Sequence, residues 1–576
     1  MSDLDRRHFL ITSALAGAAG AIASPIAPRV ALAQDDPPHE QDTTDVHGIA
    51  DTARLVVKGE LMHNVRDFGA VGDGVTNDSE ALRQAQDQGG ILFFPPGTYL
   101  VNPELLAPRD GALWVGAGSA RSVIKLADGT GGYVVDLNTK RDVEIRDLGI
   151  DGNRAAASSF LGIRLIECAR IRIERVWLFD VTGTCVGYEG ANADVVVRGC
   201  RMTAMGSSGI NGIDRTGASL DRFAFENNFV TTGAGDPGSG VGIQAYSGSD
   251  GAVSGNVVDG ETGQFLNGIM LRGCRRVRVL GNVSRRNRHD GLTFMQGCES
   301  VVVVGNVFTD SYETSGIFVI DGTSDGYGPS RGIVVTGNSL DANHLAGIRF
   351  GGGFEDSAIE GNSCSRNARF GIVCPNGDAF NVRIRGNVVA ENGEAGILAA
   401  GGRDLAVEDN SVRNNGFNTS TPASRSGIFF AGVQDCSVVG NRCIDHRGAT
   451  QTNGIELSGG CSRINVMGNV CQGNRQVGIL LDGATDCMVH DNRVEGNSQA
   501  GNGSFDGIQL VNGAIDNSVQ GNQVRAGTGR RIHNAGIAIE SDGCLVMNND
   551  LLRAGGTSLR DLGTDTIAKD NRGVDL

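Results

Sequence analysis

The sequence predicts an all-β chain that folds as a right-handed, single-stranded parallel β-helix, a solenoid with a capping helix at its N-terminal end. Three observations predict this fold. From Gly242 onward two short signatures alternate along the chain at steps of 23–32 residues, stretches of alternating polar and apolar residues lie between them, and the chain holds 87 glycines but only 12 prolines. Much glycine with little proline is typical of many tight turns in an ordered chain, and such a period is typical of a strand solenoid.

Residues 1–33 have the features of a signal peptide. Arg6–Leu10, which opens with two adjacent arginines, precedes Ile11–Ala23, an apolar run too short to cross a membrane, and Ala31–Ala33 offers a small-residue cleavage site. The arginine string resembles a twin-arginine signal, which exports folded proteins; an ordinary secretory signal is the alternative. We therefore expect a periplasmic or secreted protein with no membrane insertion after signal removal. Residues 34–60 are expected to form a linker or arm.

Residues 61–105 are predicted to form the N-terminal cap module. A turn rich in Gly and Asp is followed by a helix with Asp78 at its N-cap and by a strand, Ile91–Phe94. The segment Asn64–Val101 closely resembles the N-terminal module of the pectate lyase-like superfamily, which also opens rhamnogalacturonase- and polygalacturonase-related proteins and several phage tailspikes. The resemblance implies a pectate lyase-like β-helix over residues 61–576 and a function in handling polysaccharide.

The repeated coils are predicted to span residues 160–555, about a dozen in number. We expect both signatures at corners between strands, where glycine and asparagine tolerate a left-handed backbone. We also expect the asparagines to hydrogen-bond their counterparts above and below in a ladder. The signature glycines are Gly162, Gly242, Gly268, Gly291, Gly316, Gly347, Gly371, Gly396, Gly427, Gly454, Gly478, Gly507 and Gly536, and the asparagines are Asn256, Asn282, Asn306, Asn338, Asn362, Asn387, Asn410, Asn441, Asn469, Asn492 and Asn522.

The cysteine pattern and the net charge indicate whether disulfides form and which partners the chain binds. The 13 cysteines are odd in number and recur at similar offsets in successive repeats, so we interpret them as small buried hydrophobes rather than as disulfide partners. The net charge of −16 argues against a nucleic-acid partner, which would be bound by clustered Lys and Arg. An anionic sugar polymer is still compatible where basic residues gather locally. The expected partner is a polysaccharide, and the sequence does not predict an oligomeric state.

The candidate site follows an arginine-rich stretch. Residues 272–288 hold seven arginines and no acidic residue, and acidic or basic side chains recur just before the signature glycines of three consecutive coils. Stacking brings equivalent positions of adjacent coils to about 4.8 Å. The candidate catalytic residues are His289, Asp290, Tyr312, Glu313 and Asp321, and the candidate substrate-binding residues are Arg272, His344, Arg349 and Tyr246, with Trp177 as a further ring that could stack on a sugar. The alternative for each is a solvated corner or a packing residue.

Two reaction types fit these residues. In a lyase, Arg272 or Arg349 would neutralise a uronate while His289 or Tyr312 moved protons. In a glycoside hydrolase, Asp290, Glu313 and Asp321 would supply the carboxylates. The Asn-Thr-Asp, Asp-Asp, Gly-His-Gly and Arg-Ile-Lys motifs of polygalacturonases and the Asp-Pro-His core of alginate epimerases do not occur in recognisable form, so no family catalytic residue is assigned.

The sequence therefore predicts an exported enzyme acting on an acidic polysaccharide, as a lyase or a hydrolase. A non-catalytic β-helix that binds glycan or serves a structural role at the cell surface is one alternative, and a uronan C5-epimerase is another. No cofactor is predicted with certainty. Calcium stays open, because calcium sites are built from carboxylates that meet only in the folded chain.

Overall fold

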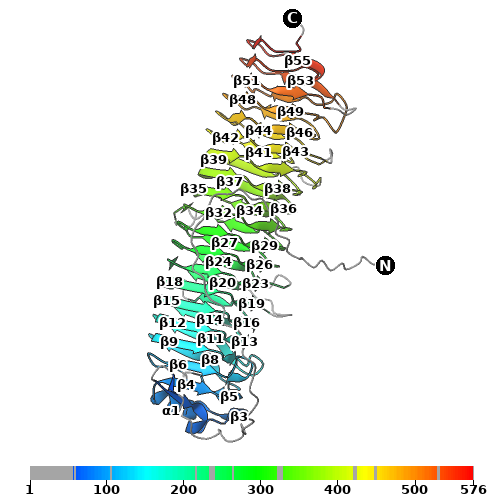
Figure 1. Ribbon diagram of the computed structural model, residues 1–576. Coiled ribbons are helices and arrows are strands. Elements are labelled where there is room, and N and C mark those ends of the chain that lie inside the picture. Colours follow the sequence, from blue (N-terminus) through cyan, green and yellow to red (C-terminus); the bar gives the residue numbers. More distant parts are fainter. Residues whose placement is uncertain are drawn as a thin grey trace, which may run out of the picture. The chain divides into compact units, whose positions relative to one another are not determined.

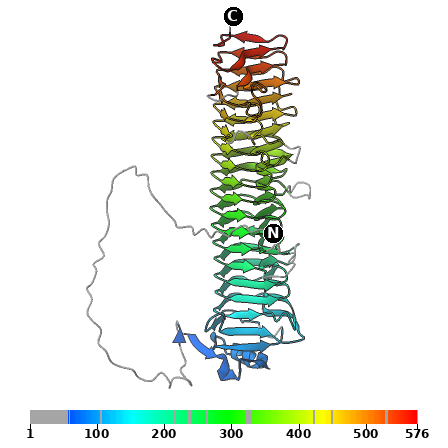
Figure 2. The same ribbon diagram turned by 90° about the vertical axis from the view of Figure 1, so that its right-hand side faces the viewer.

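The computed structural model describes residues 56–57, 60–103, 107–213, 217–232, 240–261, 265–320, 328–419, 424–446, 450–527 and 532–574. The chain divides into two units, and the second, Arg54–Leu576, contains all of these residues. The predicted signal peptide, most of the predicted arm, and Asp321 lie outside the described residues. The second unit is a stack of parallel strands with very little helix (Figures 1 and 2).

The N-terminal end of the stack carries the predicted capping helix, α1 (Ser79–Asp87), after a short 3-10 helix, η1 (Val65–Phe68). Leu82 and Ala85 of α1 are fully buried in the core. Asp78 precedes α1 as predicted, but its side chain makes no capping bond to the helix. Its carboxylate accepts the backbone N–H groups of Val71 at 2.6 Å and Gly72 at 3.2 Å instead, so Asp78 fixes the preceding turn against the helix.

Most coils contribute strands to three parallel faces, which Figure 1 shows side by side. Face 1 follows the signature glycines and lies between the other two in this view. Its strands are β8 (Gly131–Asn138), β11 (Ser158–Ile166), β14 (Thr184–Glu189), β17 (Ile210–Gly212), β20 (Val241–Tyr246), β24 (Asn267–Arg272), β27 (Leu292–Met295), β30 (Ile317–Val319), β34 (Ala346–Phe350), β37 (Phe370–Arg385), β39 (Ile397–Glu408), β41 (Ile428–Ala431), β44 (Ile455–Ser458), β47 (Ile479–Asp482), β50 (Ile508–Val511), β53 (His533–Ile539) and β55 (Gly555–Asp561).

Face 2 comes next along each coil, and β37 and β39 are long enough to continue from face 1 into it. The first strand of face 2 is β2 (Glu60–Asn64), and the two-residue strand β1 (Val56–Val57) pairs with it in antiparallel orientation. The short strands β21 (Gly248–Ser249) and β31 (Ser330–Arg331) also belong to face 2. The other strands are β4 (Ile91–Phe94), β6 (Leu113–Gly116), β9 (Arg141–Arg146), β12 (Ala169–Glu174), β15 (Ala191–Arg198), β18 (Ser219–Glu226), β22 (Ala252–Ser254), β25 (Arg278–Leu280), β28 (Val302–Val304), β32 (Val334–Thr336), β35 (Phe354–Glu360), β42 (Ser437–Val439), β45 (Asn465–Met467), β48 (Met488–His490), β51 (Ser518–Gln520), β54 (Leu545–Met547) and β56 (Ile567–Lys569).

Face 3 closes each coil before the chain returns to face 1. Its strands are β3 (Asp73–Asn77), β5 (Gly97–Val101), β7 (Ser122–Leu126), β10 (Gly149–Asp151), β13 (Trp177–Val181), β16 (Arg201–Met205), β19 (Phe229–Thr231), β23 (Val257–Asp259), β26 (Val283–Arg285), β29 (Val307–Thr309), β33 (Ser339–Asp341), β36 (Ser363–Ser365), β38 (Val388–Ala390), β40 (Ser411–Arg413), β43 (Arg442–Ile444), β46 (Val470–Gln472), β49 (Arg493–Glu495) and β52 (Gln523–Arg525).

The fold is the predicted right-handed β-helix, with about 18 coils in the described residues rather than about a dozen. Coils already stack from β4 and β5 onward, well before residue 160. The early coils were missed because their corners carry other residues than the two signatures. Alternate residues of each strand point inward, as in β27, where Leu292 and Phe294 are fully buried in one continuous core.

The predicted asparagine ladder is confirmed. Asn282 shows the pattern: its Nδ2 donates to Asn306 Oδ1 at 2.9 Å and to Val253 O at 2.8 Å, and its Oδ1 accepts from Asn256. Equivalent bonds link Asn228, Asn256, Asn282, Asn306, Asn338, Asn362, Asn387, Asn410, Asn441, Asn469, Asn492, Asn522, Asn549 and Asn571.

The backbone prediction for both signatures is wrong in detail. The ladder asparagines are not left-handed; the residue before each one is, as at Gly281, where φ is 60°. The signature glycines are not left-handed either. At Gly291 an added Cβ would lie 2.7 Å from the carbonyl oxygen of Gly316 in the next coil. Glycine is required there because adjacent coils approach closely, and not because the chain needs a special φ.

A second, unpredicted ladder runs inside the C-terminal coils. It links Asn343, Asn367, Asn392, Asn415, Gln451, Asn474, Asn497 and His533. All 13 cysteines are buried and free, which confirms their interpretation as small hydrophobes. Burial raises the pKa of the Cys436 thiol to about 12 and that of the Cys487 thiol to about 11, so these two are inert rather than reactive.

Candidate functional site

The predicted site residues gather where face 3 turns into face 1. We name this turn edge 3–1 and define it by Arg288, His289, Tyr312, Glu313 and His344, which lie on three consecutive coils. Backbone bonds from Tyr312 N to Asn287 O (2.9 Å) and from Glu313 N to Arg288 O (2.8 Å) fix the first two coils in register. The sequence prediction that these positions stack is therefore correct in geometry.

His289 and Glu313 form the charged centre of edge 3–1. The two side chains meet at 3.2 Å between Nε2 and Oε2, and Arg288 Nε donates to the other carboxylate oxygen at 2.9 Å. His289 is 38% exposed, so its ring can reach a ligand. The Arg288 guanidinium lowers the pKa of Glu313. Glu313 is thus ionised at neutral pH, where it can orient the imidazole.

Asp290 lies beneath the edge, only 3% exposed. Its carboxylate accepts hydrogen bonds from Thr293 Oγ1 (3.0 Å), from the backbone N–H of Ser315 (3.1 Å) and from the Thr314 hydroxyl. Burial raises its pKa. All of these partners come from the protein, so the geometry favours a role in holding the two coils together over direct contact with substrate.

The other predicted residues spread over the edge and the neighbouring face. Tyr312 is exposed and donates through Oη to Glu261 O at 3.2 Å, and His344 is exposed. Arg349 points outward from face 1 with its guanidinium 4.5 Å from the centre of the Phe318 ring. Tyr246 is buried beneath Arg272, 5.1 Å from ring centre to guanidinium carbon.

The arginine-rich stretch is largely neutralised by acids one coil away. Arg285 and Arg286 share buried Asp259, at 2.9 Å and 2.5 Å, and Arg276 meets Asp250 at 2.7 Å. Arg275 and Arg288 pair with Glu299 and Glu313 in the following coil. Arg272 differs, because its Nε is buried with no hydrogen-bond acceptor in the described part of the chain. Arg278 is exposed and likewise has no ion pair with any described residue.

Sequence reasoning identified only Arg349 of an outward column on face 1. The column stands two positions after successive signature glycines and includes Thr293, Phe318, Arg349, Val373, Leu398, Phe429, Glu456 and Leu480. Within it, Glu456 accepts from Asn453 Nδ2 (3.0 Å) and Ser424 Oγ (3.2 Å). On the edge, Arg369 binds fully buried Glu394 at 2.7 Å. The constant offset from glycine was the signal that could have identified the column.

The hollows of the surface do not coincide with edge 3–1. A shallow hollow of about 630 Å³ lies over β9, β12, β15 and β18 of face 2. Part of its charged lining is paired across the hollow, for example Arg222 with Asp194 at 2.8 Å. We favour edge 3–1 over this hollow because the edge has an exposed histidine and an exposed tyrosine that can move protons, whereas the lining of the hollow contains neither residue type.

Comparison with known proteins gives three family matches along the chain. Residues 62–318 match the family "Rhamnogalacturonase A/epimerase, pectate lyase-like", residues 326–417 match "Right handed beta helix region", and residues 417–560 match "Periplasmic copper-binding protein (NosD)". Residues 62–318 thus have a pectate lyase-like match, and the described chain folds as a right-handed parallel β-helix.

The names of individual relatives describe enzymes that act on uronans. Mannuronan C5-epimerase AlgE6 of Azotobacter vinelandii is 37% identical over 110 residues, 16% of this chain and 13% of the relative. Alginate lyase 7 of the same organism is 40% identical over 112 residues, again 16% and 13%. The match thus spans a small part of these relatives. Among solved structures, pre-mature bacteriophage phi29 gene product 12 is 13% identical, with a TM-score of 0.44, over 88% of this chain and 73% of that one.

The described residues do not fit a copper centre of the kind named in the NosD match. The cysteines of residues 417–560 are buried, and burial raises the pKa of the Cys487 thiol to about 11, whereas copper binds thiolates. Across the described ranges no three His, Cys, Asp or Glu side chains come together as a metal site. Calcium therefore stays a prediction. Within the same ranges, none of the helices has the length and apolar character of a membrane span.

Proposed function

We propose that the protein is an exported enzyme that acts on an acidic polysaccharide by abstracting a proton next to a uronate carboxylate, as a lyase or a C5-epimerase. The observation that carries the proposal is the exposed His289, oriented by ionised Glu313, on an edge that continues into Arg349 of face 1. The uronan-acting relatives support the substrate class.

In this mechanism His289 is the base and Tyr312 the acid. Arg349 neutralises the uronate carboxylate and so acidifies the adjacent C5–H bond; Arg272 stands at the other end of face 1, opposite Met295. His289 takes the C5 proton. In a lyase the electron pair forms the C4–C5 double bond while the C4–O bond breaks, and Tyr312 protonates the leaving oxygen. In an epimerase a proton returns to C5 from the opposite face and no bond to C4 breaks.

The geometry supports this chemistry better than glycoside hydrolysis. Hydrolysis needs one carboxylic acid that is protonated near neutral pH and accessible to the glycosidic oxygen. The pKa of Glu313 is lowered by Arg288, and Asp290 is buried among protein donors. A non-catalytic glycan-binding role is the remaining alternative, and the same assay addresses it.

The test uses the chain from Gln34 with a panel of polyuronates in D2O. Ultraviolet absorbance reports the unsaturated product of a lyase, deuterium at C5 without chain shortening reports an epimerase, and new reducing ends without absorbance report a hydrolase. His289→Ala is expected to lower the rate by about 100-fold or more. His490→Ala is the matched control, since His490 also contacts an acid, Asp491, at 3.2 Å but lies on face 2. Turnover unchanged in His289→Ala would exclude this site.

A further inference from the structure

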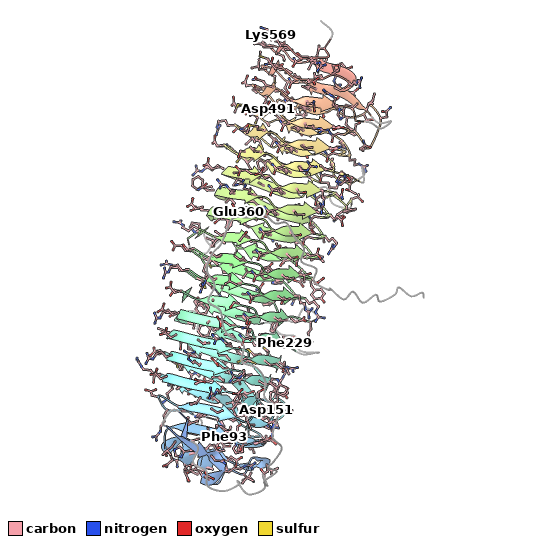
Figure 3. All side chains as sticks on the ribbon, viewed as in Figure 1. Phe93, Asp151, Phe229, Glu360, Asp491 and Lys569 are labelled. Carbon is pink, nitrogen blue, oxygen red and sulfur yellow. The ribbon has the colours of Figure 1, made fainter. Side chains whose placement is uncertain are left out.

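Face 3 carries a strip of outward apolar residues that edge 3–1 does not include. In register on successive coils stand Trp177, Arg201, Phe229, Val257, Val283 and Val307. The intervening residues Leu178, Met202 and Val230 point into the core. Phe229 is 38% and Val307 37% exposed, and Figure 3 shows Phe229 at the outer flank of the solenoid, on the side away from Glu360 and Asp491.

Arg201 is held between two aromatic rings. Its guanidinium carbon lies 5.5 Å from the centre of the Trp177 ring and 5.9 Å from that of Phe229. Trp177 is itself fixed, because its Nε1 donates to Thr203 Oγ1 at 3.0 Å and its ring centre lies 4.3 Å from that of Phe179. This arrangement is rigid before any ligand arrives, so little side-chain entropy would be lost on binding.

Arg201 differs from its neighbours in charge pairing. On the same coil Arg198 binds Glu226 at 2.8 Å, and on the next coil Arg222 binds Asp194. Arg201 is exposed and has no ion pair with any described residue. In a protein of net charge −16, an unpaired cation within an apolar strip is a place where an anionic polymer can approach without repulsion.

We propose that this strip is a second glycan-binding surface, which holds an extended acidic polysaccharide along the solenoid axis. Sugar rings present apolar C–H faces that stack on aromatic rings, while Arg201 binds a uronate carboxylate. Coils spaced by about 4.8 Å place Trp177 and Phe229 about 10 Å apart with Arg201 between them. Successive sugars of one chain can therefore contact successive coils.

The strip leads toward the proposed reaction site. Val283 and Val307 precede Arg288 and Tyr312 on the same coils, so a polymer bound along face 3 reaches edge 3–1 at its far end. The column continues beyond the strip with Ser339 and Ser363, which offer no apolar surface. The substrate class named here rests on the proposed function, whereas the binding geometry rests on face 3 alone.

The test is affinity electrophoresis of the chain from Gln34 in gels containing a long polyuronate. Retardation of the wild type is expected to weaken by about 5- to 10-fold in apparent affinity for Arg201→Gln and for Trp177→Ala. Trp177→Phe is expected to keep most of the binding because it keeps an aromatic ring. Val470→Ala, at the equivalent position of face 3 in the C-terminal coils, is the matched control, and thermal unfolding verifies that all four variants are folded.

The outcomes separate the two proposals. Equal retardation of wild type and Arg201→Gln would overturn the proposal that the strip binds glycan, even if turnover is observed. If Arg201→Gln weakens retardation but no polyuronate is turned over, the proposed catalysis is overturned and the proposed binding strip is retained. If both hold, Arg201→Gln should raise KM for long polymer and leave kcat on short oligosaccharides unchanged, since these cannot span from the strip to the edge.

Discussion

The N-terminal and C-terminal coils stack by different means. One corner column, between faces 1 and 2, runs through both. In the N-terminal coils it alternates in charge, as Asp142, Arg170, Asp194, Arg222, Asp250 and Arg276, all left-handed and paired as Arg170–Asp142, Arg222–Asp194 and Arg276–Asp250. In the C-terminal coils the same column reads Asp356, Asn381, Asp404, Asp435, Arg463 and Asp486. Acids predominate there, and the only opposite charges in contact within these six positions are Arg463 and Asp435, at 2.6 Å.

The C-terminal coils compensate in the interior. The first asparagine ladder crosses both regions, but the second, from Asn343 to His533, belongs to the C-terminal coils. Exposed ion pairs contribute about 0–1 kcal/mol and are screened by salt, whereas an unmade buried hydrogen bond costs about 1–3 kcal/mol. The first ladder fixes register in both regions; exposed charge pairs add to it in the N-terminal coils, and a second buried ladder adds to it in the C-terminal coils.

Breaking an interior ladder should have the largest effect on stability. Asn410 Oδ1 accepts two bonds from Asn387, and its Nδ2 donates to Ile384 O and to Asn441 Oδ1, all at 2.9–3.0 Å. Asn410→Ala leaves these buried groups unpaired and is expected to cost about 3 kcal/mol or more in urea unfolding. Asn381→Ala, on the exposed corner column, is the control; a comparable loss there would contradict the interior role.

His533 should make the C-terminal coils sensitive to acid. It ends the second ladder, accepting from Asn497 N through Nε2 and donating through Nδ1 to Ala554 O. Burial lowers its pKa from 6.5 to about 4. Because the unfolded chain binds the proton more readily, stability is unaffected above about pH 6.5 and falls between pH 6.5 and 4, by about 3 kcal/mol in total.

The variant His533→Asn isolates this contribution. Asparagine occupies the other positions of the ladder apart from Gln451, so the variant is expected to fold and to lose the additional destabilisation between pH 7 and pH 4.5. Urea unfolding of both proteins at the two pH values measures it. Parallel pH profiles for wild type and variant would show that His533 is not the group responsible.

The two ladders differ in how far the sequence could predict them. The first was predictable, because Gly-Asn recurs with a period that is visible along the chain, whereas the second has a weaker flanking signature and was missed. The arginine-rich stretch was misread as free charge because the partners Asp250 and Asp259 lie about one coil earlier. Pairing by coil length would have identified them. The burial of Asp290 depends on the Thr314 turn of the next coil, which no spacing reveals.

Salt should distinguish the two regions by a smaller effect. Arg222→Gln removes an exposed pair of the N-terminal column, and we expect a decrease in Tm of about 1–2 °C at low ionic strength that disappears at about 1 M salt. Asn410→Ala should remain destabilised at both salt concentrations, since buried bonds are poorly screened. Differential scanning calorimetry of the two variants gives the comparison directly, and a salt-independent loss in Arg222→Gln would contradict it.

The smallest expected effect comes from extending charge alternation into the C-terminal column. Asp404 lies between Asn381 and Asp435 with a left-handed φ of 55°, and arginine already occupies this conformation at Arg170 and Arg463. Asp404→Arg should therefore fold without added strain and raise Tm by about 1 °C at low salt, through attraction to Asp435. Asp404→Asn removes the repulsion between like charges without adding an attraction, so it separates these two contributions to Tm. If both variants gain equally, like-charge repulsion rather than missing pairs limits this column.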